Sequence, residues 1–265
     1  MFKSTMHKFA IPLLAVLLLL PLATARPAQA LTCKVNPNTV AINLSYHGAT
    51  LTVTGENTAG DELVIRIGNA AGETHYKYMG KAGGFFWMKK GNVGFKNVPG
   101  VYLLYTSRDI EHLLDPAGQK ANLIGYEALK EAAEMETASD ELNGNEAKWK
   151  EEFIRFKEHQ NLYAIHSGTI TRQHGATSDT YQAEVAWPYQ AAPGTYTVEA
   201  MAIRNGQVVD RAQSEFTVAR TGVVEWLSNL AFNSPAAYGI MAVVVAIVAG
   251  FAVGMIFRKG GGGAH

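Results

Sequence analysis

Cysteine is almost absent from this sequence, since Cys33 is the only one among 265 residues. A disulfide within the chain needs two cysteines, so the packing of the core has to hold the fold together. Lipid-anchored cysteines follow a small residue, whereas Cys33 follows Thr32, and we therefore expect no lipid here. The plainer interpretation is a half-buried thiol at the start of the first strand.

An excess of charge of one sign is missing too. The 23 lysines and arginines balance 23 aspartates and glutamates, so nothing in the charge favours nucleic acid or a strongly charged substrate as a partner.

Signatures of catalysis and of metal binding are also lacking. The sequence contains no G-x-S-x-G nucleophile motif, no P-loop and no dinucleotide fingerprint. His166 and His174 flank an expected loop and can meet in space, but the histidines show no metal-ligand spacing, and titrating surface histidines are commoner. We therefore expect a non-enzymatic protein with no cofactor and no metal site.

Long apolar runs occur only at the two ends of the chain. Near the N-terminus, basic residues precede a run from Phe9 to Leu22, and the small-residue site Ala28-Gln29-Ala30 follows. This pattern predicts a signal peptide over residues 1–30. The run is shorter than the roughly 20 residues that a spanning helix needs, although an uncleaved N-terminal anchor is the alternative.

At the other end, 22 residues from Ala236 to Phe257 carry no charge. As a helix they measure about 33 Å, which matches a hydrocarbon core of about 30 Å. Arg258 and Lys259 follow, and the positive-inside rule places residues 258–265 in the cytoplasm. Together with the signal peptide, this predicts a single-pass protein of the bacterial inner membrane whose N-terminal domain lies in the periplasm.

Small residues form a stripe along this predicted helix. They recur every four positions, at Ala242, Ala246, Gly250 and Gly254. Such a stripe allows two helices to approach closely in lipid, which predicts an interface with a partner or a second copy of the chain. The alternative is that alanine and glycine are simply common in membrane helices.

Aromatic residues flank the outer end of the predicted membrane helix. Trp226 and Tyr238 lie where an aromatic belt would contact the bilayer. Residues 221–235 also carry an apolar face that can lie on the membrane before Pro235 interrupts the chain.

Between the two ends, the pattern predicts a mainly β protein with an immunoglobulin-like antiparallel β-sandwich, built as one sandwich or two. Residues 31–107 and 163–220 show alternating apolar strands, and Gly91-Asn92 is expected to be one of the turns. In the second segment, Asn205-Gly206 predicts a hairpin, and Tyr196 follows a turn as at a sandwich corner. Phe85-Phe86-Trp87 can line a ligand groove, but core residues of a strand are the commoner case.

Residues 108–162 predict a helical insert. Ser107 can cap a short first helix, and residues from Glu127 to Ala138 favour a second. Asn145 can cap a third helix, in which Trp149, Phe153 and Phe156 form a stripe that we expect to rest on the sandwich. The insert is rich in acidic residues, which indicates a solvated face, with a docking face for a partner as the alternative.

The whole layout resembles a family of transmembrane proteins described mainly from alphaproteobacteria. The resemblance covers nearly the entire mature chain. It is carried by Leu51-Thr52-Val53-Thr54-Gly55, Trp87, Phe95, Val98-Pro99, Tyr102, Ser107, Phe153, Leu162-Tyr163, Trp187-Pro188, Pro193-Gly194-Thr195-Tyr196, Gly222, Trp226-Leu227, Ala231 and Tyr238-Gly239. The sequence departs from the usual pattern at Cys33 and in its tail from Gly260 to Gly263.

Genes of this family are often found beside permeases of the sulfite and organosulfonate exporter superfamily. The resemblance therefore implies an accessory subunit of such a permease, anchored in the lipid bilayer and exposed in the periplasm. The alternative function is a stand-alone anchored receptor that binds a small anion or a polymer.

Overall fold

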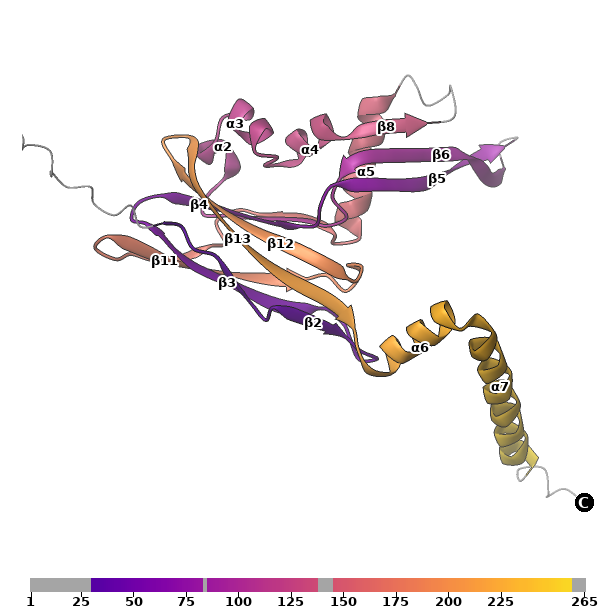
Figure 1. Cartoon of the computed structure of the whole chain (residues 1–265). Helices are drawn as coiled ribbons and strands as arrows, with labels where there is room; N and C mark the ends of the chain where they lie inside the picture. The colour runs from indigo at the N-terminus through magenta and orange to yellow at the C-terminus, as the bar shows by residue number, and fades with distance from the viewer. Residues whose placement is uncertain (1–29, 83–84, 138–144, 259–265) are drawn as a thin grey trace, which may run out of the picture.

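The computed structural model describes residues 30–82, 85–137 and 145–258, arranged as three sheets, a set of helices and a C-terminal pair of helices (Figure 1). The predicted signal peptide, apart from Ala30, and the tail from Lys259 lie outside the described residues. The strands are β1 (Lys34–Asn36), β2 (Thr39–Ile42), β3 (Ala49–Thr58), β4 (Glu62–Gly68), β5 (Gly72–Ala82), β6 (Phe86–Val98), β7 (Tyr102–Thr106), β8 (Glu134–Thr137), β9 (Tyr163–His166), β10 (Thr171–Gln173), β11 (Ser178–Trp187), β12 (Gly194–Arg204) and β13 (Gln207–Arg220). The helices are α2 (Ile110–Leu113), α3 (Pro116–Ala121), α4 (Tyr126–Ala132), α5 (Glu146–His159), α6 (Gly222–Asn233) and α7 (Pro235–Arg258).

Two sheets form a single sandwich. One has the strand order β1-β3-β11-β10 and the other β2-β13-β12-β4-β7-β9. The segments before and after the helical insert both contribute strands to each sheet, and they pair directly where β3 meets β11 and β4 meets β12. The two β segments are therefore interleaved in one unit. The mainly β class is confirmed, but the immunoglobulin-like topology is not, and the β2–β13 and β7–β9 pairs are parallel where only antiparallel pairs were expected.

Alternating side chains fill the space between the sheets. Every second residue of β11 from Asp179 to Trp187 is buried, as the period of a half-exposed strand requires. Trp187 meets Tyr196 and Phe216 of the opposite sheet, with ring centroids 4.5 and 4.9 Å away. The Tyr196 hydroxyl donates to the Ala192 carbonyl at 2.7 Å, so the predicted corner tyrosine is in place.

The hairpin between β12 and β13 turns where the sequence predicted. Asn205 and Gly206 have φ values of 52° and 76°. Two successive positive φ angles give the turn twist that matches the flanking strands.

The third sheet, β5-β6-β8, corrects several expectations. Gly91-Asn92 is not a turn, since both residues lie within the long strand β6. The second helix ends at Ala132, and residues 134–137 form β8 instead, because this segment pairs with β6 and places Glu136 against Lys96. Helix propensity is a weak preference that such tertiary pairing overrides.

The helical insert is capped and packed differently from the prediction. Ser107 does not cap α2, which begins after Asp109; its hydroxyl donates to Glu62 and accepts from the Leu63 amide. Asn145 occupies the position before α5 without a side-chain capping bond. The stripe on α5 rests mainly on the third sheet, where the Phe153 ring stacks on Phe95 at 4.5 Å.

Candidate functional site

The apolar C-terminal helix leaves the sandwich, and no other part of the described chain covers it. From Pro235 to Met255, α7 is long and apolar enough to cross a membrane, and none of that stretch is buried. Helix α6 connects it to the last strand, β13 (Figure 1).

The predicted interface residues all lie on α7. Ala242, Ala246, Gly250 and Gly254 are exposed, and their four-residue spacing places them along one face of the helix. A side chain added at Gly250 or Gly254 would meet no other part of the described chain. The small-residue face is therefore open to a second helix.

The predicted membrane-interface residues flank that helix. Trp226 lies on α6 with 55% of its surface exposed, and Tyr238 lies in the first turns of α7 with 41% exposed. Arg258 is the last residue of α7, and Lys259 lies outside the described residues. Their contact with lipid stays a prediction.

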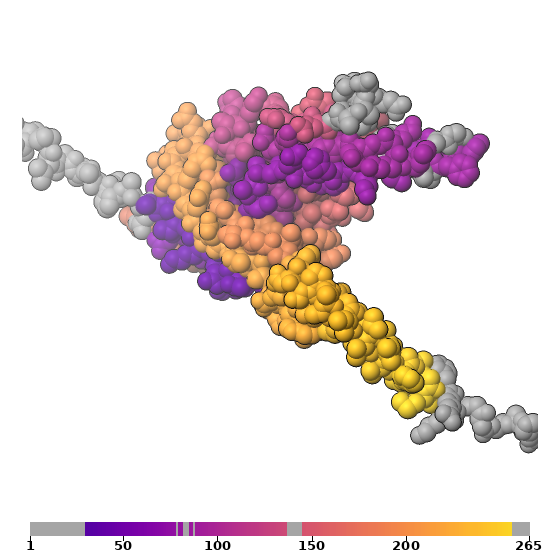
Figure 2. All heavy atoms as spheres, turned by 45° about the vertical axis from the view of Figure 1, so that its right-hand side comes forward, coloured from indigo at the N-terminus to yellow at the C-terminus, as the bar shows by residue number. Residues whose placement is uncertain are grey.

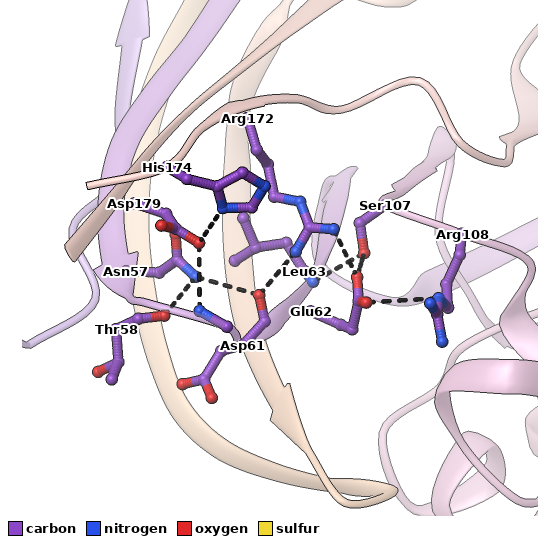
Figure 3. A network of polar contacts seen from close by, with 11 residues as sticks. Asn57, Thr58, Asp61, Glu62, Leu63, Ser107, Arg108, Arg172, His174 and Asp179 are labelled. Carbon is purple, nitrogen blue, oxygen red and sulfur yellow. Dashed lines mark hydrogen bonds and ion pairs between the residues drawn. The ribbon is translucent and has the colours of Figure 1, made fainter. Parts of the chain in front are cut away.

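A network of polar contacts joins the two sheets at the turn between β3 and β4, where Arg172 of β10 donates to the Asp61 carbonyl at 3.0 Å (Figure 3). Asp179 is fully buried and accepts hydrogen bonds from the Gly60 and Gly175 amides at 3.2 and 3.3 Å, while His174 Nδ1 lies 3.1 Å from it. Burial alone would raise the pKa of Asp179, but these contacts outweigh it and hold the pKa below its usual value. Asp61 accepts two hydrogen bonds from Arg204, at 2.6 and 2.8 Å.

The two histidines that could have met do not share a site. His174 contacts Asp179, whereas the His166 ring stacks on Tyr105 with centroids 4.7 Å apart. Across residues 30–82, 85–137 and 145–258, no group of three or more His, Cys, Asp or Glu side chains is arranged to hold a metal ion.

A second polar cluster lies on the outer face of the six-stranded sheet, under the connection from α3 to α4. Glu199 of β12 is 6% exposed and pairs with Arg66 of β4 and Arg211 of β13. Arg66 also donates to the Asn122 carbonyl at 2.8 Å. Burial would raise the pKa of Glu199, but the two arginines outweigh it and lower that pKa.

A cavity of about 300 Å³ adjoins this cluster, and its polar lining includes Arg66, Asn69, Thr197, Glu199 and Gln213. Two guanidinium groups facing one carboxylate leave a net positive charge beside the cavity. This is the arrangement among the described residues that best suits a small anion.

One family model, described as "Putative transmembrane protein" (Alph_Pro_TM), matches residues 30–259. The chain belongs to the Alph_Pro_TM family. The match spans the sandwich, the insert and α7 together, so the resemblance noted in the sequence is confirmed over the whole described structure. The family name implies an alphaproteobacterial origin, and no curated protein matches the chain.

In this Alph_Pro_TM protein, the buried cluster was missed by sequence reasoning. Arg66, Glu199 and Arg211 come from three strands, and only the sheet register makes them neighbours. One local signal existed, since Glu199 is a lone charge between apolar residues in β12. A charge in a buried strand needs a partner, so that position could have been singled out.

Cys33 lies where the sequence placed it, directly before β1 and half-buried. Its sulfur is 4.0 Å from the Val198 carbonyl oxygen, and burial raises the pKa of the thiol to about 11. A thiol with so high a pKa forms little thiolate and is poorly reactive at neutral pH.

Proposed function

We propose that this protein is a non-enzymatic accessory subunit of a membrane permease of the sulfite and organosulfonate exporter type. It is anchored in the bacterial inner membrane by α7, with the sandwich in the periplasm. The observation that carries this proposal is that α7 presents an open face of small residues and is not buried against any described part of the sandwich. In lipid, apolar burial does not drive two helices together, because the lipid tails are as apolar as the side chains. Close packing of the two helices has to drive their association instead, and a face of small residues permits that packing.

The rest of the fold supports a scaffolding role. The buried acidic residues Asp61, Asp179 and Glu199 are each paired with a cationic or amide partner within the chain. Groups held in this way stabilise a fold and are not poised to transfer a proton or attack a substrate. The sandwich would cover the outer mouth of the permease, while α7 packs against its helices.

Replacing Gly250 and Gly254 together with leucine is expected to abolish recovery of the permease with the tagged protein from native membranes. The two leucines would hold the helices apart where close approach is needed. The measurement is affinity purification in mild detergent, followed by identification of co-purified membrane proteins by mass spectrometry.

The matched control replaces Val248 and Ala252, on the opposite face of α7, with leucine. This control should recover the permease as the unmodified chain does. Equal recovery by both variants, or recovery of no permease by the unmodified chain, would count against the proposal. If the glycine variant instead loses only a second, differently tagged copy of the chain, the face serves self-association.

A second candidate function is favoured by the cavity lined by Arg66 and Glu199, whose carboxylate also pairs with Arg211. As an anchored receptor, the protein would bind a small anion such as sulfite or a sulfonate there. A ligand at about 100 times its Kd adds roughly 2.7 kcal/mol to stability, so its binding should raise the unfolding temperature of the full chain in nanodiscs. Arg66→Gln should remove that rise, because Arg66 lines the cavity, and an unchanged unfolding temperature with every anion would exclude this function.

A further inference from the structure

The β5–β6 hairpin projects from the body as a two-stranded ribbon. Its base is held firmly, because Val93 and Phe95 are buried and β8 pairs with β6 from Val93 to Lys96. No described strand pairs with the ribbon beyond that stretch. Figure 1 shows this outer part extending well past the sandwich.

The outer part of the ribbon, residues 77–90, carries exposed apolar side chains; the described residues among them are called the hairpin tip below. Phe85 and Phe86 are 80% and 72% exposed, which corrects the expectation that they belong to a strand core. Met79 and Met88 are also about half exposed, at 48% and 50%. Phe85 is the most exposed large apolar side chain in the described part of the chain before α6. Soluble surfaces rarely gather such side chains unless they bind something.

The charge of the hairpin tip has one sign only. Between Tyr76 and Phe95 the sequence has four lysines and no acidic residue. The lysines, all exposed, are Lys77, Lys81, Lys89 and Lys90. The register places Met79 directly opposite Lys89, and it shifts at a bulge between Tyr78 and Met79. The exposed apolar side chains at the end of the hairpin are thus flanked by these four lysines, which are called the lysine collar below.

This combination fits a bilayer better than a protein. Lysine is depleted in the centre of protein interfaces, whereas at a membrane its alkyl stem lies along apolar side chains and its ammonium group reaches the lipid phosphates. Phenylalanine and methionine insert among the upper acyl chains, and lysines add attraction to anionic headgroups. The chain is already tied to a bilayer by α7, and in both views the hairpin tip and α7 lie on the same side of the sandwich (Figures 1 and 2).

We propose that the hairpin tip is a second membrane contact. Phe85 and Phe86 insert into the leaflet that faces the sandwich, and the lysine collar binds anionic lipid headgroups around them. The sandwich is then held over the bilayer at two separated points and keeps one orientation. This proposal does not rest on the identity of any permease.

The test uses the full chain in lipid nanodiscs with a fluorescent label on a single cysteine. Cys33 is replaced with serine, and Met88→Cys places the label beside the two phenylalanines without removing them. Gln207→Cys, at the first residue of β13, provides an exposed control position. In nanodiscs of phosphatidylcholine and phosphatidylglycerol, the label at position 88 should be shielded from a water-soluble quencher and the label at position 207 should not.

Two sets of variants separate insertion from attraction. Phe85→Ser with Phe86→Ser should expose the label at position 88 while leaving the sandwich folded, because neither side chain belongs to the core. Lys77→Gln and Lys89→Gln should each lower the ratio of inserted to water-exposed label about fivefold, since a lysine near an anionic surface contributes about 1 kcal/mol. Nanodiscs of phosphatidylcholine alone carry no net charge and should lower this ratio further than either single variant does, because the attraction of all four lysines is lost.

Three outcomes would overturn the proposal. The first is equal quenching at positions 88 and 207 in both lipid compositions. The second is shielding at position 88 that survives the phenylalanine variant. The third is shielding in native membranes but not in lipid-only nanodiscs, which would assign the hairpin tip to a protein partner.

Discussion

Replacing Trp187 with alanine is expected to lower the free energy of unfolding by about 3–5 kcal/mol, the usual cost of removing a large aromatic side chain from a core. Trp187 is 2% exposed and ends β11 in the four-stranded sheet. Its ring meets Tyr196 and Phe216 edge to face, both in the six-stranded sheet. The substitution therefore leaves a cavity between the sheets and removes aromatic contacts that join them.

The measurement is urea unfolding of the full chain in detergent micelles, followed by circular dichroism in the β region. Tyr189→Ala is the matched control, because Tyr189 lies two residues later and is 61% exposed. That control should stay within about 0.5 kcal/mol of the unmodified chain. A similar loss in both variants would mean that the two sheets do not depend on this aromatic cluster.

The sandwich strands were predictable because their signals are local. In β11 the alternation from Tyr181 to Trp187 reports directly which side of the strand is buried, and Asn205-Gly206 specifies its own turn geometry. The membrane helix was predictable for a simpler reason, since length and lack of charge suffice to recognise it.

The third sheet was not predictable in the same way. Most of the β5–β6 ribbon beyond Tyr76 faces water on both sides, so no alternation marks it, and Gly91-Asn92 imitates a turn. The strand β8 forms in a segment rich in glutamate because β6 offers a pairing edge, with Lys96 as the partner of Glu136 and Asn97 as the partner of Glu134. The partners that make this segment a strand are distant in the sequence, so its local pattern does not reveal them. The same holds for Glu199, whose partner Arg66 lies on another strand.

Asp179→Asn is expected to lower the free energy of unfolding by about 2 kcal/mol at neutral pH. The free energy of unfolding of this variant should also decrease less as the pH falls. The Asp179 carboxylate is buried and accepts hydrogen bonds from the Gly60 and Gly175 amides. Asparagine keeps the shape but loses the charge, and its NH₂ group can no longer accept one of these bonds. A buried donor left without a partner costs about 1–3 kcal/mol.

The pH dependence follows from the direction of the pKa shift. The pKa of Asp179 is lower in the folded protein than its ordinary value, because the amide hydrogen bonds and His174 outweigh the effect of burial. Its stabilising contribution is therefore complete above the unfolded pKa of about 3.9 and disappears as the pH falls through the folded pKa. Urea unfolding between neutral pH and pH 3 should show the gap between the unmodified chain and Asp179→Asn narrowing on the acid side. The control is Glu184→Gln, which removes an exposed carboxylate from the same strand, and its free energy of unfolding should change with pH as that of the unmodified chain does. If the difference between Asp179→Asn and the unmodified chain instead stays constant with pH, the charge of Asp179 is not coupled to stability.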